Sequence, residues 1–176
     1  MIDEAGPYAR KFRLSQLAAL SAHTLPDVTP ARATWFIRLQ AFIFTLDDAL
    51  DNLRDLRVAD GYLAFEPLSA VLGALAETLA GAPRDPANER RLIEMFPMFT
   101  GFRDALAEIR GMVLAGGGDP RWFIESMRKY FEAMVWEHAA HTDAAYVPSE
   151  STYLHNREQT ISYVQSIESF LLLKGV

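Results

Sequence analysis

Three aspartates, Asp47, Asp48 and Asp51, interrupt the most apolar helical segment of the chain. If the apolar face of this helix is centred on Leu46, Asp47 and Asp51 lie about 100° and about 140° from that centre, on one edge of the face. Asp48 lies about 200° away, further towards solvent. Two carboxylates one turn apart repel each other and are costly to bury unpaired, and a divalent cation relieves both problems. Because Mg²⁺ is usually held by one or two carboxylates, waters and substrate phosphates, the spacing indicates a metal–diphosphate site.

The same aspartates have a second interpretation, because a helical D-D-x-x-D pattern arises often by chance. They would then form a solvated acidic edge whose carboxylates pair with Arg54 or Arg57. The motif by itself does not decide between the two interpretations.

Helices must position these carboxylates, because helical spacing dominates the sequence and strand alternation is nearly absent. Thr29-Pro30 predicts the start of the aspartate helix, with a capping hydroxyl followed by proline at the first helical position. Apolar residues then recur at intervals of three and four, which places them on one face of a long helix: Trp35, Leu39, Phe42, Leu46, Leu50 and Leu53.

Further helices are predicted on both sides of this one. They cover residues 7–23, 67–79, 86–115 with a kink at Pro97, 119 to about 145, and 148 towards 173. Asp60-Gly61 and the run 116–118 of three glycines mark loops between them. No repeat, low-complexity tract or linker divides the chain, so the expected fold class is an all-α helical bundle in one domain over residues 1–176.

Composition excludes several function classes. The chain has 176 residues and no cysteine, which rules out disulfides, thiolate metal sites and cysteine catalysis. Its formal net charge of −6, with acidic and basic residues interspersed, argues against a nucleic-acid partner. It shows no signal-peptide pattern and no apolar run long enough to span a bilayer, so we expect a cytoplasmic protein without a membrane span.

Two separated motifs resemble those of bacterial class I terpene synthases. The run from Phe44 to Asp51 is similar to the family's aspartate-rich motif, including the aromatic residue three positions before the first aspartate. About a hundred residues later, the run 146–160 resembles the segment in which a Pro-Ser helix start is followed by a tyrosine and then R-x-x-T. Residues 163–168 resemble the family's continuation of that segment. Two motifs in the family's order are far more specific than either alone.

The resemblance implies a class I terpenoid synthase fold and a role for each matched residue. Asp47 would bind Mg²⁺, or Mn²⁺ in its place, most directly, and Asp48 and Asp51 would be ligands or lie close to it. Arg157 matches the diphosphate sensor, an arginine whose planar fork grips phosphate oxygens. Thr160 and Ile161 match the family's linker and effector residues at a break in the helix. The family usually has a small residue where this chain has Ile161, although that role needs only a main-chain carbonyl.

The implied reaction is ionisation and cyclisation of an acyclic isoprenyl diphosphate. Metal ions and Arg157 would neutralise the departing diphosphate, with Asp47 and Arg157 as the catalytic pair. An aromatic face can stabilise the allylic cation, and Phe44 is the best-placed substrate-binding aromatic. Four other side chains are candidates for a cavity wall but fit ordinary core packing better: Tyr130, Phe131, Met134 and Trp136.

The chain also departs from the family. The second metal motif, an N-D/S-E triad on a later helix, does not occur in its 176 residues, nor does the late Arg-Tyr pair. We therefore expect a truncated domain with little cyclase activity alone, which forms a homo-oligomer or needs a complementing C-terminal part. The alternatives are a non-catalytic, self-associating helical remnant and a trans-prenyltransferase-like protein, although the second D-D-x-x-D of that class is missing.

One further cluster contains residue types that bind metals. Glu137, His138 and His141 place two histidines three residues apart on a predicted helix. Neither the zinc order H-E-x-x-H nor the di-iron order E-x-x-H occurs here, so this segment is interpreted as a polar helix end.

Overall fold

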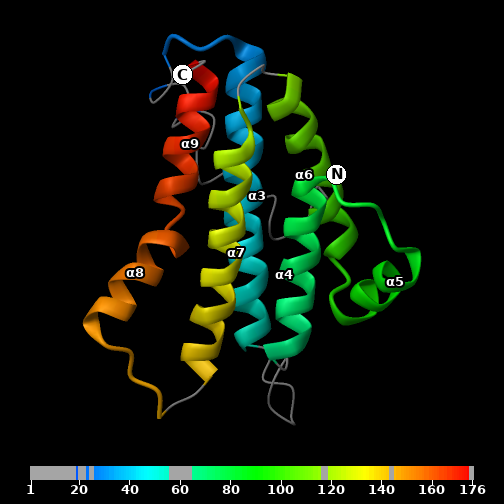
Figure 1. Ribbon diagram of the computed structural model, residues 1–176, viewed down its shortest axis with the longest axis vertical. Helices are drawn as coiled ribbons and strands as arrows, with labels where there is room; N and C mark the ends of the chain where they lie inside the picture. Colours follow the sequence, from blue (N-terminus) through cyan, green and yellow to red (C-terminus); the bar gives the residue numbers. More distant parts are fainter. Residues whose placement is uncertain are drawn as a thin grey trace.

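The computed structural model describes residues 19, 23, 26–55, 65–115, 119–142 and 145–174, with the side chains of 51–55, 65–67, 141–142, 163, 170 and 172–174 excepted. Within these ranges the chain forms only helices (Figure 1). They are α3 (Pro30–Asp55), α4 (Phe65–Ala80), α5 (Pro86–Met95), α6 (Phe99–Ala115), α7 (Arg121–Thr142), α8 (Glu150–Thr160) and α9 (Tyr163–Lys174). The all-α prediction is confirmed. The helix predicted over residues 7–23 lies outside the described residues, apart from two helical positions, 19 and 23.

Helix starts follow the local cap and proline signals. The aspartate helix α3 begins at Pro30, as the sequence predicts. Before α5, the Asp85 side chain accepts a hydrogen bond of 2.9 Å from the Ala87 N–H. Before α8, the Ser149 hydroxyl accepts one of 3.2 Å from the Thr152 N–H. Each cap satisfies a donor that the first turn of a helix leaves without a partner.

The segment 86–115 forms two helices, where the sequence predicted one kinked helix. Phe96 is extended, with φ −141° and ψ 91°. A proline disfavours the helical conformation in the residue before it, so Pro97 ends α5 at this point. The ring of Phe96 then stacks on Phe102, with ring centroids 5.7 Å apart, which fixes the turn between the two helices.

The predicted helix from 148 towards 173 is also divided. It ends as α8 at Thr160 and restarts as α9 at Tyr163. Ser162 lies between them with φ +53°, a left-handed conformation that is uncommon for a residue with a side chain. Its carbonyl accepts hydrogen bonds from the N–H of Ser166 at 3.0 Å and from the Ser166 hydroxyl at 2.9 Å. The break therefore starts a new, locally capped helix.

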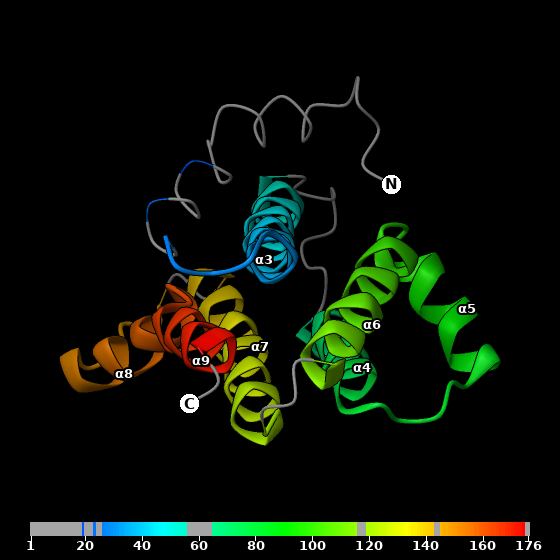
Figure 2. The same cartoon turned by 90° about the horizontal axis from the view of Figure 1, so that it is seen from above.

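The longer helices surround one core. Seen from above, α3, α4, α6, α7 and α9 are arranged around the centre, whereas α5 and α8 lie on the outside (Figure 2). In keeping with that position, α8 contributes no buried residue. Among the described ranges, no helix combines the length and the apolar character that crossing a membrane would require.

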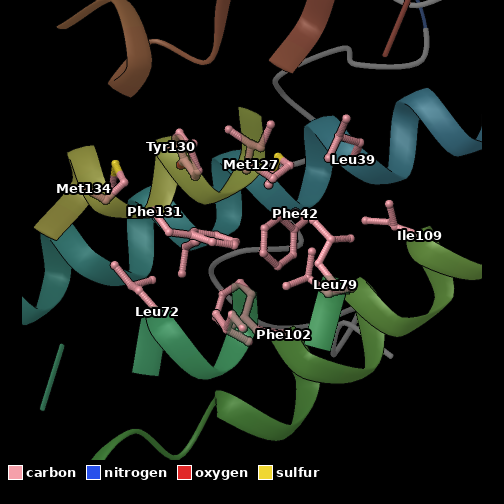
Figure 3. Packing of buried hydrophobic residues seen from close by; sticks show 14 of the residues in the cluster. Leu39, Phe42, Leu72, Leu79, Phe102, Ile109, Met127, Tyr130, Phe131 and Met134 are labelled. Atoms are coloured by element: carbon pink, nitrogen blue, oxygen red, sulfur yellow. The ribbon is translucent and has the colours of Figure 1, made fainter. Parts of the chain in front are cut away.

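Apolar side chains fill the space between these helices. The cluster includes Leu39, Phe42, Leu72, Leu79, Phe102, Ile109, Met127, Phe131 and Met134 (Figure 3). Within this cluster Phe42 on α3 contacts both α6 and α7, because its ring meets Phe102 edge-to-face at 5.6 Å and Phe131 at 6.3 Å. The centre of the described bundle is thus a packed core that joins α3, α6 and α7.

Replacing Phe42 with Ala should therefore be among the most destabilising changes in the core. The substitution removes the ring that touches both Phe102 and Phe131 and leaves a cavity, so we expect a loss of about 3–5 kcal/mol in the free energy of unfolding. Urea denaturation followed by circular dichroism measures it. A loss under about 1 kcal/mol would contradict this packing.

Polar contacts attach α9 to the same core. The amide of Gln165, which is fully buried, donates a hydrogen bond of 2.7 Å to the main-chain oxygen of Ser126 on α7. The amide of Gln40 on α3 donates one of 3.3 Å to the Ser166 hydroxyl. A buried bond of this kind is costly to leave unmade, so it fixes the register of α9.

Candidate functional site

A cleft of about 520 Å³ lies between α7, α8 and the loop before α8. Its volume is within the range of small-molecule sites. Aromatic and small apolar side chains form most of its wall, and the polar groups gather around one arginine. The lining residues are Trp136, Glu137, Ala140, Pro148, Tyr153, Arg157 and Thr160.

The guanidinium of Arg157 is the polar centre of this cleft. Its Nη1 donates a hydrogen bond of 3.2 Å to the Thr160 hydroxyl and lies 3.4 Å from Oε1 of Glu137. The Arg157 side chain is 47% exposed, whereas that of Glu137 is 18% exposed. The structure thus brings together two of the predicted site residues, Arg157 and Thr160, and leaves the guanidinium open to solvent on one side.

The helix break follows directly after these two residues. The Ile161 N–H donates to the Arg157 carbonyl at 3.1 Å, which closes the last turn of α8, and Ser162 then adopts its left-handed conformation. Such backbone strain costs on the order of 1–3 kcal/mol and is common at functional sites. The break lies where the resemblance placed it, although the side chain of Ile161 is 52% exposed.

Aromatic contacts define the register of α3 against α7. Trp35 meets Phe123 with ring centroids 5.7 Å apart, and Phe42 meets Phe131 at 6.3 Å. These pairs are 88 and 89 residues apart, so the helices run parallel with a nearly constant offset. The same offset places Asp47 level with residues 135–136, less than one turn from Glu137. The aspartate motif and the arginine cleft are therefore at the same height of the bundle.

A buried tyrosine lies within the electrostatic reach of both acidic groups. Tyr130 is fully buried on α7 (Figure 3). Burial raises the pKa of its phenol, and the charges of Asp47 and then Glu137 raise that pKa further. The hydroxyl has no hydrogen-bond partner within the described residues. The phenol therefore stays protonated, and its pKa depends on the charge of Asp47 on α3 and on that of Glu137 on α7.

Replacing Tyr130 with Phe tests this environment. A buried hydroxyl without a partner contributes no hydrogen bond, so its removal should leave the free energy of unfolding unchanged or raise it by up to about 1 kcal/mol. Urea denaturation of the variant beside the wild type gives the difference. A loss of more than about 1 kcal/mol would mean that the hydroxyl makes a bond that stabilises the fold.

The aspartates of α3 are the candidate metal ligands. Asp47 and Asp48 are both partly buried on α3, and Asp51 lies on the same helix with its side chain outside the described set. Among the described side chains, no group of three or more His, Asp or Glu residues is placed to hold a metal ion. Mg²⁺ does not require such a cage, because one or two carboxylates with waters and phosphate oxygens suffice.

The predicted aromatic residues divide between core and cleft. Tyr130, Phe131 and Met134 are all buried in the bundle, as the packing interpretation predicted. Trp136 instead lines the cleft. Phe44 is 49% exposed on α3, and the cleft walls come from residues 136–160, so the structure does not bring Phe44 to the arginine.

Glu137 is the residue that sequence reasoning missed. It was considered only together with His138 and His141, but its carboxylate pairs with Arg157 twenty residues later. His138 is buried, and α7 ends at Thr142, so Glu137, His138 and His141 lie near the end of that helix. One signal was available, because Glu137 lies seven residues after Tyr130, two turns along nearly the same face of α7.

Comparison with known proteins agrees with the two motifs. The family model described as "Terpene synthase family 2, C-terminal metal binding" matches residues 38–175, which include the aspartates, the cleft and the helix break. No curated protein and no solved structure gives a significant match. Because the family match covers most of the chain, the protein belongs to terpene synthase family 2.

Proposed function

We propose that this chain binds an acyclic isoprenyl diphosphate together with Mg²⁺ and promotes its ionisation, the first step of terpene cyclisation. The observation that carries the proposal is the common height of Asp47, Glu137 and Arg157, next to a cleft with apolar walls. A diphosphate reaching from α3 to α8 would meet carboxylates at one end and a guanidinium at the other. The family assignment supports the same chemistry.

Arg157 and Thr160 would bind the diphosphate. The guanidinium fork donates to two phosphate oxygens at once, and the Thr160 hydroxyl, 3.2 Å from Nη1, holds the arginine beside the ligand. Asp47 and Asp48, with Asp51, would hold Mg²⁺, or Mn²⁺ in its place. When bound, the metal neutralises negative charge on the diphosphate as it leaves.

The prenyl chain would lie along the apolar wall of the cleft. Trp136, Pro148 and Tyr153 contribute two aromatic rings and a proline ring to this wall. As the allylic C–O bond breaks, its electron pair leaves with the diphosphate and a carbocation remains. Aromatic faces stabilise such a cation, and a dry wall delays its capture by water.

Binding assays with matched ligands test the proposal. Isothermal titration of the chain with farnesyl diphosphate, farnesyl monophosphate and farnesol, in the presence of Mg²⁺, should give affinities in that order. Adding EDTA should weaken the binding of farnesyl diphosphate more than that of the other two ligands. Equal affinity for the diphosphate and the alcohol would contradict the assignment of Arg157.

Incubation with several substrates tests the reaction class. Geranyl, farnesyl and geranylgeranyl diphosphate are each mixed with the chain and Mg²⁺, with and without isopentenyl diphosphate. Release of diphosphate from an allylic substrate alone is the outcome that ionisation predicts. Longer prenyl diphosphates, formed only when isopentenyl diphosphate is present, would instead indicate a prenyltransferase.

A further inference from the structure

Glu137 occupies the place in the cleft where an anionic ligand of Arg157 would bind. Its Oε1 lies 3.4 Å from Nη1 of Arg157, and both residues line the cleft. Charge-assisted hydrogen bonds between nitrogen and oxygen are usually about 2.7–2.9 Å long. The contact is therefore long for an ion pair, and it can be exchanged for a shorter one.

The two partners are held by very different surroundings. Glu137 is on α7, a core helix, and its side chain is 18% exposed. Arg157 is on the outer helix α8, which has no buried residue, and its side chain is 47% exposed. Glu137 is thus the fixed member of the pair, and Arg157 is the member that can turn towards a ligand.

Glu137 also lies at nearly the same height of the bundle as Asp47. The register of α3 and α7 brings Asp47 within one turn of its height, and the charges of both residues act on the same buried phenol, Tyr130. A diphosphate that spans the distance from α3 to Arg157 therefore approaches the carboxylate of Glu137. The diphosphate and the Glu137 carboxylate are both anions and repel each other. The partly buried setting screens this repulsion less than water would.

We propose that Glu137 is an exchangeable counter-ion of Arg157, which holds the guanidinium in the cleft before substrate binds and gives way to a diphosphate oxygen. It is a positioning residue, because it acts through Arg157. The inference rests on the proposed function of Arg157 as the diphosphate ligand. It adds that the site contains a built-in competitor for its own substrate, which sets how readily free diphosphate binds.

Replacing Glu137 with Gln separates competition from simple support. The amide keeps the size of the side chain and removes its charge, so metal-free pyrophosphate should bind about three to ten times more tightly than it does to the wild type. Isothermal titration in EDTA, at one fixed ionic strength, measures this difference. Glu132→Gln is the matched control. Glu132 is on the same helix and pairs with Arg128, away from the cleft, so this variant should bind pyrophosphate as tightly as the wild type does.

Weaker or unchanged binding of pyrophosphate by the Gln variant would overturn the inference, because a residue that only supports Arg157 cannot increase affinity when it is lost. If Glu137→Gln does not fold, Glu137→Asp is used in the same titration. It withdraws the carboxylate by one methylene and should tighten binding by a smaller factor. In the double variant with Arg157→Gln, the gain should disappear.

The two proposals fail in different ways. If Arg157→Gln alone leaves pyrophosphate binding unchanged, the diphosphate site itself is wrong. If Arg157→Gln weakens binding but Glu137→Gln does not tighten it, the site stands and only the exchange at Glu137 is wrong.

Discussion

Replacing Arg157 with Gln should lower the affinity for pyrophosphate in the presence of Mg²⁺ by about 10- to 100-fold. The guanidinium can make two charge-assisted hydrogen bonds to phosphate oxygens, and a hydrogen bond to a charged group contributes about 1.5–3 kcal/mol. Each 1.4 kcal/mol corresponds to about a factor of ten in affinity. Isothermal titration measures the change, with circular dichroism to show that the variant is folded.

A lysine at the same position should give an intermediate result. It keeps the positive charge but loses the planar fork, so we expect the affinity to lie between those of the wild type and the Gln variant. Arg128→Gln is a suitable control, because Arg128 is 49% exposed, close to the 47% of Arg157, and binds Glu125 and Glu132 instead. If the Arg157 and Arg128 variants lose affinity equally, the effect is one of net charge and not of the cleft.

Replacing Asp47 with Asn should remove the effect of Mg²⁺ on pyrophosphate binding. For the wild type we expect Mg²⁺ to raise the affinity at least about tenfold, because Asp47 and Asp48 would hold the metal and its charge would neutralise part of that of the phosphates. An amide is a poor substitute for that charged ligand, so the enhancement should fall to about twofold or less. Titrations in Mg²⁺ and in EDTA, performed on the same protein, give the ratio directly.

Two further variants show whether this effect belongs to the site. Asp48→Asn should reduce the enhancement less than Asp47→Asn, since Asp48 lies further round the helix towards solvent. Asp104→Asn should leave it unchanged, because Asp104 is exposed on α6 and paired with Arg103. A full Mg²⁺ effect in the Asp47 variant would mean that the metal binds elsewhere.

The helix starts were predictable because their signals are local. Pro30 and Ser149 act within one turn of their own helix, so the sequence around each is sufficient. The two helix breaks are held by contacts that reach beyond one helical turn. Phe96 stacks on Phe102, and Gln165 on α9 bonds to Ser126 on α7, and neither contact follows from periodicity. Periodicity therefore predicted a kink at Pro97 and one continuous last helix, and only the family resemblance indicated a break at Thr160 and Ile161.

The same contrast between local signals and contacts made by packing applies to the site residues. Asp47 and Arg157 belong to two motifs whose residue types and spacing are specific, so they could be proposed as site residues without a structure. Glu137 belongs to no motif, and its role depends on how α8 folds back onto α7. Tyr130 was predicted as core, which is where it lies, but its relation to Asp47 follows only from the register of α3 and α7. What sequence reasoning lacked was the packing that makes these residues neighbours.

A crystal structure of the chain with Mg²⁺ and pyrophosphate tests the central claim most directly. We expect a diphosphate in the cleft between α7 and α8, with the guanidinium of Arg157 bound to its oxygens and a metal ion bound to Asp47. We also expect the contact between Arg157 and Glu137, 3.4 Å in the present structure, to be broken. A diphosphate bound away from Arg157, or a metal bound without Asp47, would contradict it.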